Sequence, residues 1–225
     1  MLVSSLAAVI ASAMALVSAS PMKKWHGCDV SGAELDLPST NVISVPKGTK
    51  PEYIVLGIGT QNYTCTAAGN YTSAGAVATL IDISCLYQYN PKLFEDVQDR
   101  VYNLMPMYGH NIPSWHKIEA VLGHYPYIVG DHYFIPEDGA IAPKFGFRRS
   151  GKGDVDAFTV DKRVGGIPSP ENSRNIDWLQ LQSTAGELSK YTFRVDTQGG
   201  QPPKSCHKEG HTITVPYTTK YWFLK

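Results

Sequence analysis

The chain has 225 residues, enough for one sizeable domain or two small ones, and its 20 Lys and Arg balance its 20 Asp and Glu. A chain with no net charge lacks the positive potential that nucleic-acid binding needs, so we exclude nucleic acid as a partner. Hydrophobic residues make up 43% of the chain, which excludes global disorder, while 20 Gly and 15 Pro argue against a helical bundle.

Residues 1–19 have the features of a secretory signal peptide. They contain no charged side chain, an apolar stretch from Leu6 to Leu16, and then Val17-Ser18-Ala19, which offers small residues at the two positions that a signal peptidase reads. This stretch is too short and too rich in serine to span a bilayer. No second apolar run is long enough and no linker divides the rest, so we expect residues 20–225 to form a single secreted domain, soluble and without a membrane partner.

The secretory route gives meaning to the cysteines and to two asparagines. The 4 cysteines, Cys28, Cys65, Cys85 and Cys206, are spaced too widely for a metal or redox motif. We expect two disulfides, and the spacing leaves all three connectivities open. Asn62 and Asn70 each begin an N-glycosylation acceptor, and we predict that both lie on exposed turns.

Most of the mature chain has the patterns of β-strands. Residues 53–58 and 76–83 are rich in Val, Ile and Leu between Gly clusters, which predicts buried strands. Residues 190–196 alternate between apolar and polar side chains, which predicts a strand with one wet face, and residues 215–223 also place their aromatic side chains on one face. An Asp-Gly pair at 138–139 between apolar residues predicts a hairpin.

One segment has helical spacing instead. Between residues 91 and 105 the apolar residues recur every three or four positions, with Asn90 as a cap, Pro91 in the first turn and Pro106 as a stop. We therefore predict an all-β fold, a single β-sandwich or barrel-like domain with one inserted amphipathic helix near residues 91–105.

Two glycine motifs resemble nucleotide-binding sequences but fail at a defining position. Gly57-Ile58-Gly59 follows an apolar strand, but Asn62 stands where a dinucleotide fingerprint has its third glycine, so we interpret the segment as a tight bend between two strands. Residues 146–153 nearly spell a phosphate loop, but Gly153 replaces the hydroxyl residue that would hold magnesium. We predict no cofactor.

Catalytic and metal motifs have little support. His207 and His211 have a spacing that suits a metal site on a helix, but Gly210 and the residues after it predict a turn into a strand, so we expect no metal. His132 interrupts an apolar strand pattern and is the candidate general base, the alternative being a histidine held by a backbone carbonyl. No nucleophile elbow or zinc-protease motif is present.

The candidate binding residues are Tyr133, Arg148 and Trp178. Arg148 belongs to a group of cations interleaved with phenylalanines that could contact an anionic or sugar ligand, the alternative being a solvated hairpin tip. Trp178 follows Asp177, an arrangement that suits an acid beside a sugar-stacking ring, the alternative being a half-buried ring in a strand.

Five blocks of sequence, taken in order, resemble one family. The blocks are Gly59–Cys65, Gly130–Phe134, Ile176–Leu179, Asp196–Pro203 with Cys206, and Val215–Tyr217 with Tyr221–Phe223. Together they resemble the DUF3455 family of secreted fungal and bacterial proteins, which has no established activity and often carries an automatic malate dehydrogenase label. The resemblance covers residues 28–225 and implies a secreted fungal protein. It also implies the pairing of Cys65 with Cys206 and of Cys28 with Cys85.

We therefore predict a secreted, disulfide-bonded, monomeric glycoprotein of the extracellular space or cell wall, which binds cell-wall carbohydrate or a host surface. The alternatives are a secreted hydrolase with His132 as its general base and a structural matrix component. A pocket with His132 and a second titratable group would favour the enzyme, and an exposed aromatic row would favour binding. We expect neither NAD binding nor malate dehydrogenase activity, because the glycine motif at 57–59 leads into no helix.

Overall fold

The computed structural model describes residues 27–39, 42–105, 127–148 and 157–225. The expected signal peptide at residues 1–19 lies outside the described residues, as does most of the motif at 146–153.

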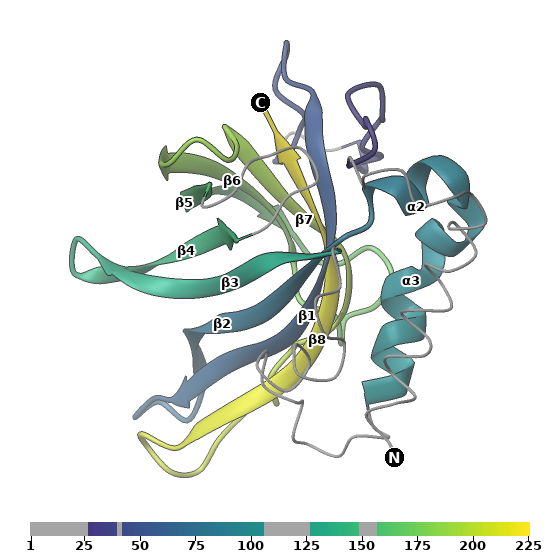
Figure 1. Cartoon of the computed structure of the whole chain (residues 1–225). Coiled ribbons are helices and arrows are strands. Elements are labelled where there is room, and N and C mark those ends of the chain that lie inside the picture. The colour runs from purple at the N-terminus through teal and green to yellow at the C-terminus, as the bar shows by residue number, and fades with distance from the viewer. Residues whose placement is uncertain (1–26, 40–41, 106–126, 149–156) are drawn as a thin grey trace.

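Eight antiparallel strands form a closed barrel in which each strand pairs with its neighbours in sequence and β8 pairs with β1 (Figure 1). The strands are β1 (Pro51–Cys65), β2 (Tyr71–Asp82), β3 (Ile128–Glu137), β4 (Ala140–Phe147), β5 (Phe158–Ile167), β6 (Trp178–Ala185), β7 (Tyr191–Gly199) and β8 (Thr212–Leu224). The prediction of an all-β, barrel-like fold is confirmed. The sandwich alternative is wrong, because the pairing of β1 with β8 closes the sheet.

Side-chain alternation separates the two largest clusters of the core, one inside the barrel and one outside it. In β1, Tyr53 and Val55 belong to the cluster inside the barrel, together with rings such as Phe145. Ile54 and Leu56 belong to a second cluster on the outside of the same strand. β1 is therefore buried on both faces, which explains the continuous apolar run at residues 53–58.

Two helices within the described ranges cover one side of the barrel, next to β1 and β8 (Figure 1). α3 (Pro91–Leu104) begins as predicted, because the Asn90 side chain accepts a hydrogen bond from the Leu93 backbone N at 3.2 Å and Pro91 occupies the first turn. The prediction of one helix missed α2 (Ser84–Tyr89), whose 6 residues are too few to show a helical period.

A buried lysine joins α3 to the barrel. Lys220, on the outer face of β8, is only 2% exposed. Its Nζ donates to the Glu95 carbonyl oxygen at 3.0 Å and to Asp196 Oδ2 at 2.8 Å, and lies 4.6 Å from the centre of the Phe94 ring. The Thr218 hydroxyl also donates to a carbonyl of α3, that of Gln98, at 2.8 Å. These contacts fix the helix on β8.

The predicted hairpin connects β3 to β4. Glu137 pairs with Ala140, which leaves Asp138 and Gly139 as a two-residue turn. Their φ angles are 48° and 79°, and two consecutive positive values are typical of the type I′ turn that matches strand twist.

The glycine motif in β1 is part of a continuous strand. Gly57 pairs with Leu80 on β2 and Thr219 on β8, so the interpretation of this segment as a tight bend between two strands is wrong. A Cβ atom at Gly57 would lie 2.6 Å from the ring of Tyr221, so the glycine makes room for that ring inside the barrel. No strand-to-helix turn forms there, and such a turn is what a dinucleotide pyrophosphate requires.

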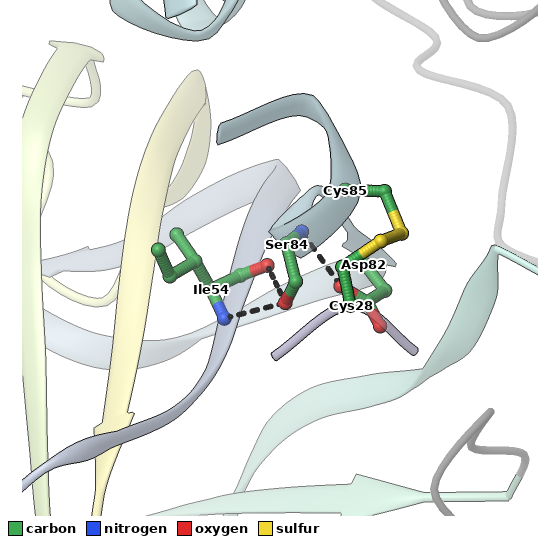
Figure 2. The surroundings of a disulfide bond; sticks show 5 residues. All are labelled: Cys28, Ile54, Asp82, Ser84 and Cys85. Atoms are coloured by element: carbon green, nitrogen blue, oxygen red, sulfur yellow. Dashed lines mark hydrogen bonds between the residues drawn. A yellow bond between two sulfur atoms is a disulfide. The ribbon is translucent and has the colours of Figure 1, made fainter. Parts of the chain in front are cut away.

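The two disulfides join Cys28 to Cys85 and Cys65 to Cys206, the same pairs that the family resemblance implied. Figure 2 shows the first, which ties the N-terminal segment to the start of α2. Beside it the Ser84 hydroxyl accepts from the Ile54 backbone N at 3.2 Å, and the Ser84 backbone N donates to Asp82 Oδ1 at 2.8 Å. The second disulfide ties the end of β1 to the loop before β8.

Candidate binding site at the mouth of the barrel

The segments that carry the family resemblance meet inside the barrel around Arg194 of β7. Register places Arg194 opposite Tyr221 of β8 and Leu179 of β6. After the larger effect of burial, the charge of Arg194 also acts on the pKa of Tyr63, His132, Tyr217 and Tyr221, which come from β1, β3 and β8. Residues far apart in the sequence therefore share one electrostatic environment.

Arg194 is held by the backbone of Asp177. Its Nε and Nη2 donate to the Asp177 carbonyl oxygen at 3.1 and 2.9 Å. The carboxylate of Asp177 instead lies 3.9 Å from Nη2 of Arg163, too far for a hydrogen bond. The side chains of Arg163 and Asp177 are 58% and 40% exposed, so solvent reaches this end of the barrel. Because a guanidinium has five N–H donors, both arginines keep donors for a ligand. We call this end, with Arg163, Asp177 and Arg194, the mouth.

Three tyrosine hydroxyls lie behind the mouth. Those of Tyr217 and Tyr221 are 3.0 Å apart, and burial raises the pKa of each, that of Tyr217 well above its ordinary value. Tyr63 donates to the Gly200 carbonyl oxygen at 2.7 Å, and burial raises its pKa to about 12. All three hydroxyls therefore stay protonated at neutral pH and act as hydrogen-bond donors.

Two buried amides add further donors. Gln61 Nε2 and Asn175 Nδ2 have no hydrogen-bond partner among the described residues. Gln61 lies beside the Tyr217 hydroxyl and lowers its pKa, against the larger effect of burial. The Asn175 side-chain oxygen accepts from the Gly199 backbone N at 2.9 Å, which leaves its amide nitrogen free. An unpaired buried donor costs about 1–3 kcal/mol, so an acceptor group on a ligand fits this environment.

His132 does not have the surroundings of a general base. It is 2% exposed, its ring stacks on Phe145 at 4.2 Å, and its Nδ1 lies 3.0 Å from the Lys144 carbonyl oxygen. Burial lowers the pKa of His132 to about 3, so the ring is neutral, and no acidic side chain contributes to that pKa. His132 therefore matches the alternative interpretation of the sequence, a histidine held by a backbone carbonyl.

Tyr133 and Arg148 lie away from the mouth, on the outer face of β3 and β4. Tyr133 is 37% exposed, and the Nζ of Lys144 lies 6.0 Å from the centre of its ring and 4.5 Å from that of Phe158 on β5. Arg148 forms an ion pair with Asp131 of β3. The exposed rings of Tyr133 and Phe158 and the half-buried Lys144 thus form a row of aromatic and cationic side chains, which we call the outer row.

Trp178 is not available as a sugar-stacking surface. It is 6% exposed and packs in the outer apolar cluster, where it lies across from Ile167 of β5. The acid before it, Asp177, is the residue that reaches the mouth.

The two glycosylation acceptors differ in their surroundings. Asn70 is exposed in the turn between β1 and β2. Asn62 is half-buried within β1, where its Oδ1 accepts from the Thr60 hydroxyl at 3.3 Å, so the prediction that it lies on an exposed turn is wrong.

Within the described ranges no three His, Cys, Asp or Glu side chains gather as metal ligands do. His207 and His211 lie in the loop before β8 and not on a helix. In the same part of the chain, no helix has the length and apolar character needed to cross a membrane.

The site that sequence reasoning missed is centred on Arg194. The alternation around Arg194 predicts a strand whose polar face is wet. In the structure the polar face lines the barrel, and Thr192 on that face is 0% exposed. The missing information was the closure of the sheet, which decides which face is inside.

Comparison with known proteins gives a family and no activity. The searches of curated proteins and of solved structures found no match. Residues 46–225, which include the whole barrel, match the family described as Protein of unknown function (DUF3455). The chain therefore belongs to the DUF3455 family.

Proposed function

We propose that this protein is a secreted binding protein that holds an acidic carbohydrate of the cell wall, one with uronate groups, at the mouth of the barrel. The observation that carries the proposal is the guanidinium of Arg194, which is held by a backbone carbonyl and is accompanied by the exposed guanidinium of Arg163. Two disulfides fit a protein of the secretory route.

The mouth has the chemistry that such a ligand needs. Guanidinium groups bind carboxylates through paired, charge-assisted hydrogen bonds. The amide of Gln61 supplies a neutral donor nearby, and the exposed carboxylate of Asp177 accepts from sugar hydroxyls. The outer row, which lies away from the mouth, offers a separate aromatic surface, because rings stack on the apolar faces of sugars.

The alternative functions have less support. A hydrolase that uses His132 would need that ring to reach its substrate, but the ring is buried and its pKa of about 3 makes it a very weak base. A structural matrix component needs no reachable arginine at all. Specific binding of a soluble oligosaccharide therefore separates the proposed function from a purely structural role.

The test uses the secreted, oxidised protein. A glycan array with acidic and neutral polysaccharide fragments is followed by calorimetry with the acidic fragment bound best. Arg163→Gln should weaken this binding about 10- to 100-fold, since a hydrogen bond to a charged group contributes about 1.5–3 kcal/mol. Lys162→Gln is the matched control, because Lys162 is an exposed cation next to Arg163 whose side chain alternates to the other face of β5.

The results of these experiments test the position of the carbohydrate site separately from the carbohydrate function. Loss of binding in Arg163→Gln but not in Lys162→Gln supports the mouth. Equal binding by both variants would show that the carbohydrate binds elsewhere on the molecule. No binding to any glycan by folded protein would refute the carbohydrate function itself.

A further inference from the structure

The opposite end of the barrel carries a surface hollow, at the connection from β6 to β7. Its volume is about 570 Å³, and its lining includes Ser183, Glu187, Ser189, Lys190, Tyr191 and Lys225. The charged side chains of the lining are those of Lys190, Lys225 and Glu187. Register separates this end from the mouth, because Ser183 pairs with Asp161 near the start of β5, whereas Leu179, which lies opposite Arg194, pairs with Gly166 near its end.

A buried carboxyl group lies beneath the hollow. Asp161 is 0% exposed, and the Thr159 hydroxyl donates to its Oδ1. Asp161 Oδ2 has no hydrogen bond of good geometry among the described residues, although the Thr192 hydroxyl lies close enough to stabilise the ionised form. A buried carboxyl with so few donors is unusual, because an ionised carboxylate normally accepts several hydrogen bonds.

Two hydroxyl pairs connect this carboxyl group to the hollow. Thr159 Oγ1 lies 3.0 Å from the Ser183 hydroxyl, and Thr192 Oγ1 lies 3.1 Å from the Ser189 hydroxyl. Ser183 and Ser189 both line the hollow. Each hydroxyl has one proton, so a threonine that donates to an ionised Asp161 has none left for its serine. A protonated Asp161 can instead donate to Thr159, which then donates to Ser183.

The protonation of Asp161 is set by burial and not by a neighbouring charge. Burial raises its pKa from 3.8 to about 6, and the Thr159 and Thr192 hydroxyls oppose this rise. On the neighbouring strands, Ser183 of β6 pairs with Asp161 and Phe145 of β4 pairs with Thr159, while β7 contributes Thr192. Arg163 is on the same face of β5 but lies beside Asp177 at the mouth, and neither Glu187 nor the lysines of the hollow contribute to this pKa.

We propose that the hollow binds a small oxyanion, such as a sulfate or carboxylate group, and that it binds tightly only while Asp161 is protonated. The ammonium groups of Lys190 and Lys225 and the hydroxyl of Ser189 are the donors for the anion, whereas the Ser183 hydroxyl donates to the Ala185 carbonyl oxygen at 3.2 Å. An ionised Asp161 puts a second negative charge beneath the anion and commits the threonine protons to itself. By linkage, the anion in turn favours the protonated carboxyl group. This site is independent of the proposed carbohydrate function.

Sulfate is the probe, because its charge does not change between pH 5 and pH 7.5. In calorimetry, sulfate should bind about 30-fold more tightly at pH 5 than at pH 7.5. The reason is that a carboxyl group with a pKa of about 6 is mostly protonated at pH 5 and about 3% protonated at pH 7.5. Asp161→Asn, which is neutral throughout, should bind sulfate tightly at both pH values. Glu187→Gln is the control for the other carboxylate of the hollow and should keep the pH dependence.

The Lys190→Gln variant provides a second test of the proposal, one that needs no substitution at the buried Asp161. It should weaken sulfate binding about tenfold at pH 5, as expected for the loss of one charge-assisted hydrogen bond. Wild-type binding that is equal at the two pH values, a pH dependence that persists in Asp161→Asn, or unchanged binding in Lys190→Gln would each overturn the proposal. Failure of carbohydrate binding at the mouth has no bearing on these outcomes.

Discussion

The buried carboxyl group of Asp161 should affect the stability of the fold as well as anion binding. Its pKa rises on folding from 3.8 to about 6 because burial disfavours the charged form. The folded state therefore favours the protonated carboxyl, and the stabilisation that results is fully present below pH 3.8 and is lost as the pH rises through about 6. At about 1.4 kcal/mol per unit of pKa, this contribution is about 3 kcal/mol.

The measurement compares wild type with Asp161→Asn by urea unfolding, disulfides intact, at pH 3.5 and pH 7.5. The amide of the variant has no proton to lose in this range, so the free energy of unfolding of wild type, relative to the variant, should fall by about 3 kcal/mol between these pH values. In thermal unfolding this equals a relative change in Tm of about 6–12 °C for a domain of this size. The difference between the two proteins removes the pH dependence of other groups. A difference that stays constant with pH would show that Asp161 is not a buried carboxyl with a raised pKa.

Three further predictions follow from the contacts around the barrel. Asp196→Asn should lower the free energy of unfolding by about 2 kcal/mol, because it leaves the Lys220 ammonium buried with a weaker partner. The double variant Asp196→Asn with Lys220→Met should recover at least half of that loss. Urea unfolding measures both variants. Replacing Cys28 and Cys85 with Ala opens a loop with a sequence separation of 57, which should cost about 4 kcal/mol in the same assay, and a loss below about 1 kcal/mol would contradict it. Mass analysis after glycosidase treatment should find glycan on the exposed Asn70, and an unmodified Asn70 in protein from a eukaryotic host would refute that site.

The elements that the sequence predicts well are those whose signal is local. The helix from Pro91 follows from its cap, its proline and the spacing of its apolar residues, all of which lie within one short segment. The hairpin at Asp138 and Gly139 follows from two residues that tolerate positive φ. By contrast, α2 has too few residues for a period, and the straight course of β1 through Gly57 depends on the Tyr221 ring from the far end of the chain.

The candidate site could not be found by the same means, because its members share no local pattern. Arg194, Asp177 and Arg163 lie on different segments and come together only when β5, β6 and β7 pair in this register. His132 was singled out because a polar residue in an apolar pattern is visible in sequence. Arg194 stands at a polar position of an alternating strand and therefore looked ordinary.

The alternation in β7 shows why the polar face of this barrel holds the site. Phe193 and Val195 belong to the outer apolar cluster, which the helices cover, whereas Thr192 and Arg194 face the inside. An alternating pattern reports that the two faces differ, and the usual inference assigns the polar one to solvent. Here the helices bury the outer face, so the polar side chains of this strand point into the barrel. Their partners there are the Asp177 carbonyl oxygen for Arg194 and the Ser189 hydroxyl for Thr192. The two proposed sites lie on this inner face, with Arg194 of β7 at the mouth and Asp161 of β5 beneath the hollow.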